Sequence, residues 1–140
     1  MKMLLRTAVG LTVVGLCTVA PARAQGVPEG ATKEMVDKGN EIFHKQGLCY
    51  ACHGQDGKRI RLQDLGNLTT KAGAGEAMKT WPSYRVSQGA VWTMQRRLID
   101  CMRQARWPEP NYLADSIIAL ETYLQKNATG TVMETPGIKR

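Results

Sequence analysis

The sequence predicts an all-α domain of about three to four helices. Three stretches, near residues 32–46, 88–105 and 115–126, repeat apolar residues at helical spacing. The segments between them are rich in glycine or proline, and no run of residues has the strict alternation of a half-buried strand. The chain has 140 residues, which is the length of one domain, and it contains no internal repeat.

The first helix is predicted to begin at Thr32, which would cap it, and to stop at Gly47. The apolar positions that share one face of this helix are Met35, Val36, Gly39, Ile42 and Phe43. Residues 54–80 contain five glycines and are predicted to be mostly loop, with room for a short helical turn. Trp81-Pro82-Ser83-Tyr84 is predicted to be a turn.

A second long helix is predicted over residues 88–105, and Trp107-Pro108-Glu109-Pro110 would end it. Its apolar stripe consists of Val91, Met94, Leu98, Cys101, Met102 and Ala105. The last helix is predicted to start at a cap formed by Asp115 or Ser116 and to run to about Lys126. Its apolar face consists of Ile117, Ile118, Leu120, Tyr123 and Leu124. The tail from residue 129 is predicted to be irregular.

Residues Cys49-Tyr50-Ala51-Cys52-His53 form the most specific motif of the chain. The pattern Cys-x-x-Cys-His is the attachment signature of c-type haem. Two thiols at this spacing can form thioether bonds with the two vinyl groups of one porphyrin, and the following histidine can coordinate the iron. We therefore expect Cys49, Cys52 and His53 to hold one covalent haem c. The same spacing occurs in zinc and redox sites, but no second Cys-x-x-Cys pair is present to complete a zinc site.

The N-terminal segment has the pattern of a secretory signal peptide. Lys2 and Arg6 form a positive start, residues 11–20 are apolar, and Ala22-Arg23-Ala24 is typical of a cleavage site. We expect residues 1–24 to be removed, residues 25–31 to form a flexible leader, and residues 32–140 to form a single c-type cytochrome domain in the periplasm. The apolar run is short for a membrane span, and a retained N-terminal anchor is the alternative.

The formal net charge of the chain is +7, and cleavage of the signal peptide would remove three basic residues and no acidic one. The mild basicity that remains suits an acidic protein partner or an anionic substrate. No basic stripe or aromatic platform indicates binding of nucleic acid.

The function depends on the ligand at the other side of the iron. Methionine is usual in electron-carrying cytochromes c, and the candidates are Met78, Met94, Met102 and Met133. Met94 and Met102 lie at helical spacing and are interpreted as packing residues, whereas Met78 lies in a predicted loop and is a fair candidate. His44 precedes the motif and is interpreted as a surface residue.

Cys101 is the other candidate, because Cys17 lies in the predicted signal peptide and Cys49 and Cys52 belong to the motif. It follows Arg97 by four residues, so the two would share one face of a helix. A guanidinium beside a thiol favours the thiolate, which is the nucleophile and the better ligand. The alternative is that Cys101 packs as a small apolar residue while Arg97 is solvated.

Gly39 and Phe43 in the first helix and Tyr123 in the last resemble the crossing of the N- and C-terminal helices in class I cytochromes c. The resemblance implies that fold, with the helices arranged around one covalently bound haem.

A second resemblance covers roughly residues 35–140. The residues that carry it are Trp81-Pro82-Ser83-Tyr84-Arg85, Gln95-Arg96-Arg97-Leu98-Ile99-Asp100-Cys101-Met102, Ala119-Leu120-Glu121-Thr122-Tyr123-Leu124, Gly130 and Pro136-Gly137. They are similar to the C-terminal haem domain of the SoxA family, the catalytic cytochrome subunit of the SoxAX complex of bacterial sulfur oxidation. The family normally carries a further N-terminal cytochrome-like domain, which we do not expect in a chain of 140 residues.

The SoxA resemblance implies a role for each site residue. His53 would be the proximal ligand of the iron, Cys101 the distal ligand and reactive sulfur, and Arg97 the anion-binding residue, helped by Arg96 and Arg103. The implied activity is that of an L-cysteine S-thiosulfotransferase, which oxidatively joins thiosulfate to a cysteine of a SoxYZ-type carrier protein. A SoxX-type cytochrome is the implied partner for electron exit.

Two other functions remain open from the sequence. One is a thiosulfate dehydrogenase that joins two thiosulfates to tetrathionate. The other is a plain electron carrier in which His53 and a methionine such as Met78 bind the iron.

Overall fold

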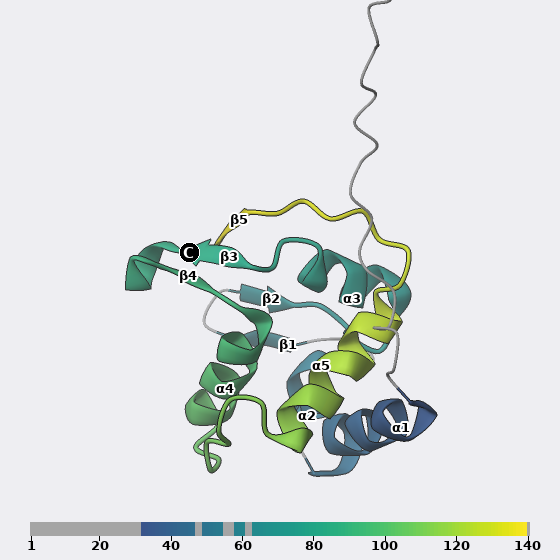
Figure 1. Ribbon diagram of the computed structural model, residues 1–140. Helices are drawn as coiled ribbons and strands as arrows, with labels where there is room; N and C mark the ends of the chain where they lie inside the picture. Colours follow the sequence, from purple (N-terminus) through teal and green to yellow (C-terminus); the bar gives the residue numbers. More distant parts are fainter. Residues whose placement is uncertain (1–31, 47–48, 55–57, 61–62, 140) are drawn as a thin grey trace, which may run out of the picture.

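The computed structural model describes residues 32–46, 49–54, 58–60 and 63–139, and its described part is mainly helical (Figure 1). The predicted signal peptide and leader, and the predicted helix stop at Gly47, lie outside the described residues. The helices are α1 (Lys33–Glu41), the π-helical turn η1 (Ile42–Gln46), α2 (Cys49–His53), α3 (Lys71–Met78), the 3₁₀ turn η2 (Val86–Gln88), α4 (Met94–Gln104) and α5 (Asp115–Asn127). The strands are β1 (Lys58–Ile60), β2 (Gln63–Leu65), β3 (Ser83–Arg85), β4 (Ala90–Trp92) and β5 (Gly137–Lys139).

Helices α1 and α5 cross at a glycine, as the sequence predicts (Figure 1). A Cβ on Gly39 would lie 2.7 Å from Tyr123 Cβ and closer still to the carbonyl oxygen of Ala119, so the two backbones touch there. The ring centroids of Phe43 and Tyr123 lie 5.5 Å apart beside this crossing. The expected cap is also confirmed, because the Thr32 hydroxyl accepts a hydrogen bond from the Met35 N–H at 3.3 Å.

The core lies between helices α1, α3, α4 and α5. Its buried apolar residues are Val36, Ile42, Phe43, Ala74, Met78, Trp81, Trp92, Met94, Leu98, Ile99, Ile117, Ala119, Leu120, Tyr123, Leu124 and Ala128. The predicted apolar face of α5 is confirmed, although Ile118 is only partly buried. The helix itself begins at an Ala114 cap that forms no side-chain hydrogen bond, so the expected cap at Asp115 or Ser116 is wrong.

The expectation of a purely α-helical domain is wrong in one respect, because the described residues include five short strands. Strands β1 and β2 pair antiparallel, and β4, β3 and β5 form a second sheet in that order. Strand β3 lies where a turn was predicted, and β5 lies in the tail predicted to be irregular. Each strand has three residues, which is too short for alternation to be visible in the sequence.

The second long helix is shorter than predicted. It begins at Met94, because Gly89 at φ 59° turns the chain into β4 before the helix can form. The Thr93 hydroxyl caps the helix by accepting a hydrogen bond from Arg96 N–H. The predicted loop before Trp81 contains the two-turn helix α3, which begins at a Thr70 cap. Among the described residues, no helix is both long and apolar enough to cross a membrane.

Candidate functional site

The motif residues lie on α2, directly after the π-helical turn that ends the first helical segment. Cys49, Cys52 and His53 are all partly buried, and both cysteines have free thiols. Burial, together with nearby thiols of Cys101 and Cys52, raises the pKa of Cys49 to about 11. Cys49 packs against the edge of the core.

The His53 side chain is held by the backbone of the loop after β2. Its Nδ1 atom lies 3.1 Å from the carbonyl oxygen of Gly66, so Nδ1 carries the proton and donates to that oxygen. The Leu68 N–H donates to the His53 carbonyl at 3.0 Å and fixes the same loop. Burial lowers the pKa of His53, the Gly66 bond opposes this, and Arg97 adds to it.

This donor set fits a c-type haem. A histidine that ligates a metal ion usually donates its other ring N–H to a carbonyl or carboxylate, and His53 does so through Nδ1. Its Nε2 atom is then the nitrogen available to iron. The two thiols precede His53 on the same short helix, at the spacing that thioether attachment needs.

The structure brings Cys101 to the motif. Cys101 lies on α4, partly buried, and its thiol interacts electrostatically with the thiols of both Cys49 and Cys52. Of the four cysteines in the chain, the three that the structure describes therefore meet in one region.

The charges around Cys101 act in opposite directions. Burial is the largest cause and raises the pKa of Cys101, and Asp100 adds to the rise. Arg97 and Arg85 oppose it by favouring the thiolate. Arg97 lowers the pKa of Cys101, as the sequence predicts, but the effect of burial on that pKa is larger.

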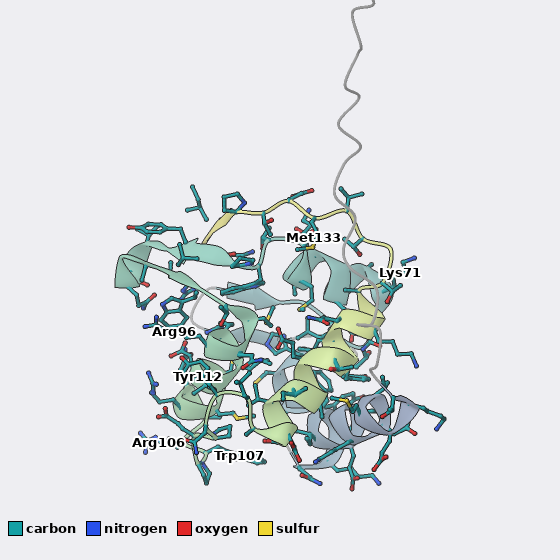
Figure 2. All side chains as sticks on the ribbon, in the orientation of Figure 1. Lys71, Arg96, Arg106, Trp107, Tyr112 and Met133 are labelled. Carbon is teal, nitrogen blue, oxygen red and sulfur yellow. The ribbon has the colours of Figure 1, made fainter. Side chains whose placement is uncertain are left out.

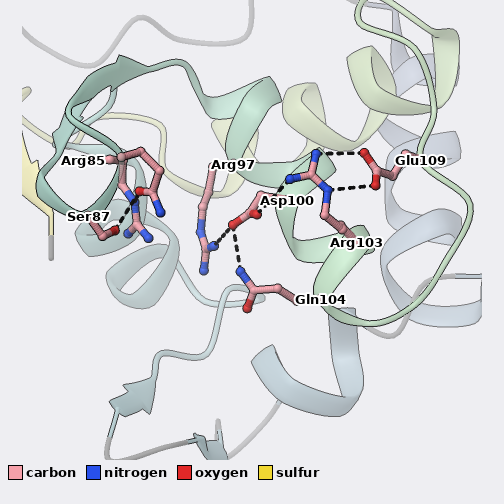
Figure 3. Close-up of polar contacts among 8 residues, drawn as sticks. Arg85, Ser87, Arg97, Asp100, Arg103, Gln104 and Glu109 are labelled. Atoms are coloured by element: carbon pink, nitrogen blue, oxygen red, sulfur yellow. Dashed lines mark hydrogen bonds and ion pairs between the residues drawn. The ribbon is translucent and has the colours of Figure 1, made fainter.

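Arg97 is held by a network along α4 (Figure 3). Its guanidinium donates to Asp100 at 2.9 Å, and the amide of Gln104 donates to the same carboxylate at 2.7 Å. The side chains of Arg97 and Asp100 are both mostly buried. Arg97 acts electrostatically on both His53 and Cys101, so its charge lies near both residues.

Two other arginines expected at the site have different roles. Arg103 forms a two-bonded ion pair with Glu109, with distances of 2.8 and 2.9 Å (Figure 3). Arg96 stacks over the ring of Trp92, with its guanidinium carbon 4.5 Å from the ring centroid.

Arg85 is the site residue that the sequence analysis missed. It lies on β3, its Nε donates to Gln88 at 3.3 Å, and its guanidinium carbon lies 5.4 Å from the Trp92 ring centroid. Figure 3 shows Arg85 and Arg97 on two different elements. Arg85 lies on a different element from Cys101, in a strand paired with β4 and β5, so spacing along the chain carries no signal of it.

The methionine candidates lie at different depths. Met78 and Met94 are buried in the core, and Met102 packs against its edge. Met133 is partly buried in the segment before β5 (Figure 2). The packing interpretation of Met94 and Met102 agrees with the structure. His44 is exposed, as predicted, and its Nε2 lies 3.2 Å from the Tyr123 hydroxyl.

Fold and site together define a small, mainly helical domain in which a Cys-x-x-Cys-His motif lies near a third cysteine, Cys101, which in turn lies near two arginines. The same fold occurs in the crystal structure of SoxXA from P. pantotrophus, with a TM-score of 0.63 and 24% identity over 77% of this chain and 40% of the other.

Over this shared part, the chain is a relative of the SoxA subunit of L-cysteine S-thiosulfotransferase. It is 51% identical over 113 residues to the SoxA subunit of Hydrogenophilus thermoluteolus and 34% identical over 114 residues to one from Hydrogenobacter thermophilus. A third SoxA subunit, from Pseudaminobacter salicylatoxidans, is 28% identical over 118 residues. The matched part spans about two fifths of the length of these relatives, 41%, 42% and 38% in turn. No family model matches the chain.

Proposed function

We propose that this chain is an exported, periplasmic monohaem cytochrome of sulfur oxidation that joins thiosulfate to a carrier-protein cysteine. The observation that carries the proposal is the meeting of Cys101 with the haem-attachment motif, beside Arg97 and Arg85. The similarity to L-cysteine S-thiosulfotransferase subunits supports the same reaction.

Four residues would hold the haem in this proposal. Cys49 and Cys52 would form the thioether bonds, and His53, through Nε2, and Cys101 would bind the iron. A thiol that coordinates a metal ion is deprotonated, which offsets the raised pKa of Cys101. When bound, the haem supplies one-electron redox chemistry.

The reaction balances as an oxidative coupling of two sulfur atoms. The Cys101 thiolate and the outer sulfur of thiosulfate form an S–S bond and release two electrons. The carrier cysteine, after losing its proton, attacks that outer sulfur, takes the thiosulfate group and frees the Cys101 thiolate. The net change is carrier thiol plus thiosulfate to carrier S-thiosulfonate, one proton and two electrons. A partner cytochrome of SoxX type accepts the electrons one at a time.

The arginines have a direct part in this reaction. Thiosulfate is a dianion, and Arg97 places a fixed positive charge beside the Cys101 sulfur. Asp100 holds Arg97 in one orientation, so the guanidinium is preorganised before the anion arrives. Arg85 adds positive charge from the sheet side.

Replacement of Cys101 tests the proposal. Cys101→Met should give a folded haem protein without thiosulfate-dependent turnover, and the EPR spectrum of the oxidised protein should differ from that of the wild type. Met102→Leu, at the next position of α4, is the matched control and should keep both the spectrum and the turnover. If Cys101→Met and the wild type have the same spectrum and turnover, Cys101 is neither ligand nor nucleophile. Product analysis separates the two enzymes, because tetrathionate formed without a carrier protein would indicate a thiosulfate dehydrogenase.

A further inference from the structure

The indole ring of Trp92 carries two arginine side chains. The guanidinium carbon of Arg96 lies 4.5 Å from the ring centroid, and that of Arg85 lies 5.4 Å from it. Both distances lie within the range of about 6 Å over which an aromatic face attracts a cation, and tryptophan gives the strongest attraction. Trp92 is only 4% exposed, so the core holds the ring in place and the ring is a fixed platform for the arginines.

The register of the β4-β3-β5 sheet explains why Arg85 reaches Trp92. Trp92 pairs with Ser83, and Ala90 pairs with Arg85. Paired residues, and residues two apart along a strand, share one face of a sheet, so these four side chains lie on the same face. Arg85 and Trp92 are diagonal neighbours on that face, a separation that long and aromatic side chains can span. Ser83 is small and fully buried, which leaves room for the indole beside it.

A hydrogen bond holds Arg85 at a second point. Its Nε donates to the side-chain oxygen of Gln88 at 3.3 Å, and the Ser87 hydroxyl donates to the same oxygen at 2.8 Å (Figure 3). These residues belong to η2, which ends at Gly89 in the left-handed conformation that glycine adopts without strain. The turn and the ring therefore hold the Arg85 side chain in one orientation.

The indole N–H of Trp92 is buried and has no hydrogen-bond acceptor among the described residues. A buried donor without a partner costs free energy, and phenylalanine would fill an apolar position without that cost. Tryptophan differs from phenylalanine in presenting a larger aromatic face, which attracts a cation more strongly. The presence of tryptophan at position 92 therefore indicates a role for the face of the ring.

We propose that Trp92 is a positioning residue, which holds the Arg85 guanidinium where it can bind the anionic oxygens of the sulfur substrate. This inference rests on the proposed function, because it assigns a second anion contact in that reaction. Arg85 acts electrostatically on Cys101, so its charge lies near the reacting sulfur. A guanidinium that is already held in place loses less side-chain freedom when the substrate binds than a mobile one does.

Arg96 offers a comparison on the same ring. Its side chain is exposed on α4, whereas the arginines that act on Cys101 are Arg97 and Arg85. Removal of Arg96 uncovers the same indole and leaves both of those charges in place. Arg96→Ala is therefore the matched control for a change at Arg85.

The test is a double-mutant cycle in the full, haem-loaded chain, with turnover measured from thiosulfate, the carrier protein and ferricyanide as electron acceptor. Arg85→Ala should raise the KM for thiosulfate about tenfold, which is typical of losing a hydrogen bond to a charged group. Trp92→Leu should raise the KM about fivefold, because the guanidinium then leaves its position. The double variant should match Arg85→Ala, because Trp92 acts through Arg85. The kcat of all three should stay within about twofold of the wild type, since the arginine binds the ground state and the transition state alike.

Two further proteins separate the ring face from other effects. A trifluorinated tryptophan at position 92 keeps the shape and the N–H but withdraws charge from the ring face, so it should raise the KM about threefold. If the N–H were the functional group, fluorination would strengthen its donation and lower the KM instead. Arg96→Ala should change the KM by less than about twofold.

The reduction potential gives a readout that needs no turnover. A positive charge near Cys101, the proposed ligand, stabilises the reduced haem, so Arg85→Ala should lower the potential. Trp92→Leu should lower the potential as well, and the double variant should again match Arg85→Ala.

Additive effects of Trp92→Leu and Arg85→Ala, on the KM or on the potential, would overturn the proposal. An unchanged or lowered KM with the trifluorinated residue would also overturn it, and this protein decides the matter if Trp92→Leu does not fold. An Arg96→Ala protein as impaired as Arg85→Ala would do the same. A wild type without thiosulfate turnover would instead refute the proposed function, and the potentials of the same variants would then decide the part of Trp92, so the two failures are distinguishable.

Discussion

The crossing of α1 and α5 predicts a large cost for one added methyl group at Gly39. A Cβ there would lie 2.7 Å from Tyr123 Cβ, whereas ordinary contacts begin at 3.4 Å, so the helices must separate by about 0.7 Å to clear this atom alone. The carbonyl of Ala119 is closer and belongs to a helix backbone that cannot rotate away. Overpacking of this kind costs about 3 kcal/mol, and the better helix propensity of alanine returns about 1 kcal/mol.

We therefore expect Gly39→Ala to lower the free energy of unfolding by about 2 kcal/mol or more, which corresponds to a fall in Tm of about 8 °C or more. Urea unfolding of the haem-loaded protein measures the difference. Asn40→Ala is the matched control, because Asn40 is the next residue of α1 and is exposed. A Gly39→Ala protein within about 0.5 kcal/mol of the wild type, the range of ordinary surface substitutions, would show that the helices do not touch at this point.

Three further predictions follow from individual side chains. Thr32→Ala removes the cap of α1 and should cost about 1 kcal/mol in urea unfolding, whereas Thr32→Asn should cost little. Burial raises the pKa of Glu121 above its usual 4.5, so near that pH the folded protein keeps a proton that the unfolded chain releases. The free energy of unfolding should therefore fall as pH rises from 4.5 to neutral. Glu121→Gln should remove this decline, and an equal decline in both proteins would contradict the assignment. Under the proposed function, Arg103→Ala should change kcat/KM for thiosulfate less than twofold, because Arg103 pairs with Glu109. Arg97→Ala should lower kcat/KM about tenfold or more. Equal changes of kcat/KM in the two variants would mean that Arg97 does not bind the anion.

Much of the helical framework was predictable because its signals are local. The apolar spacing of the first and last helices and the Thr32 cap depend on residues within a few turns of one another. The Gly39 crossing joins residues far apart in the chain, and it was expected from the resemblance to class I cytochromes c. The strands were not predictable for the opposite reason. Strand β3 pairs with β5 more than fifty positions later, and three residues are too few to show a period.

Some residues of the candidate site were also predictable from the sequence, and others were not. The motif from Cys49 to His53 is contiguous, and Cys101 with Arg97 follows helical spacing, so each was visible in the sequence. Arg85 was not visible, because it lies on a different element from Cys101. The effect of burial on the thiol was also missed, since spacing along one helix says nothing about depth in the protein.

The hydrogen bond from His53 Nδ1 to the Gly66 carbonyl bears on the reduction potential of a haem bound to His53. A histidine that donates strongly through Nδ1 becomes a more basic ligand at Nε2, and a more basic ligand stabilises the oxidised metal. Gly66 directly follows strand β2, whose pairing with β1 sets where the loop begins. With His53 on the iron as proposed, the β1-β2 hairpin therefore tunes the reduction potential without supplying any ligand. Evolution could then adjust the driving force for electron release through hairpin residues alone, leaving every sulfur and nitrogen donor unchanged.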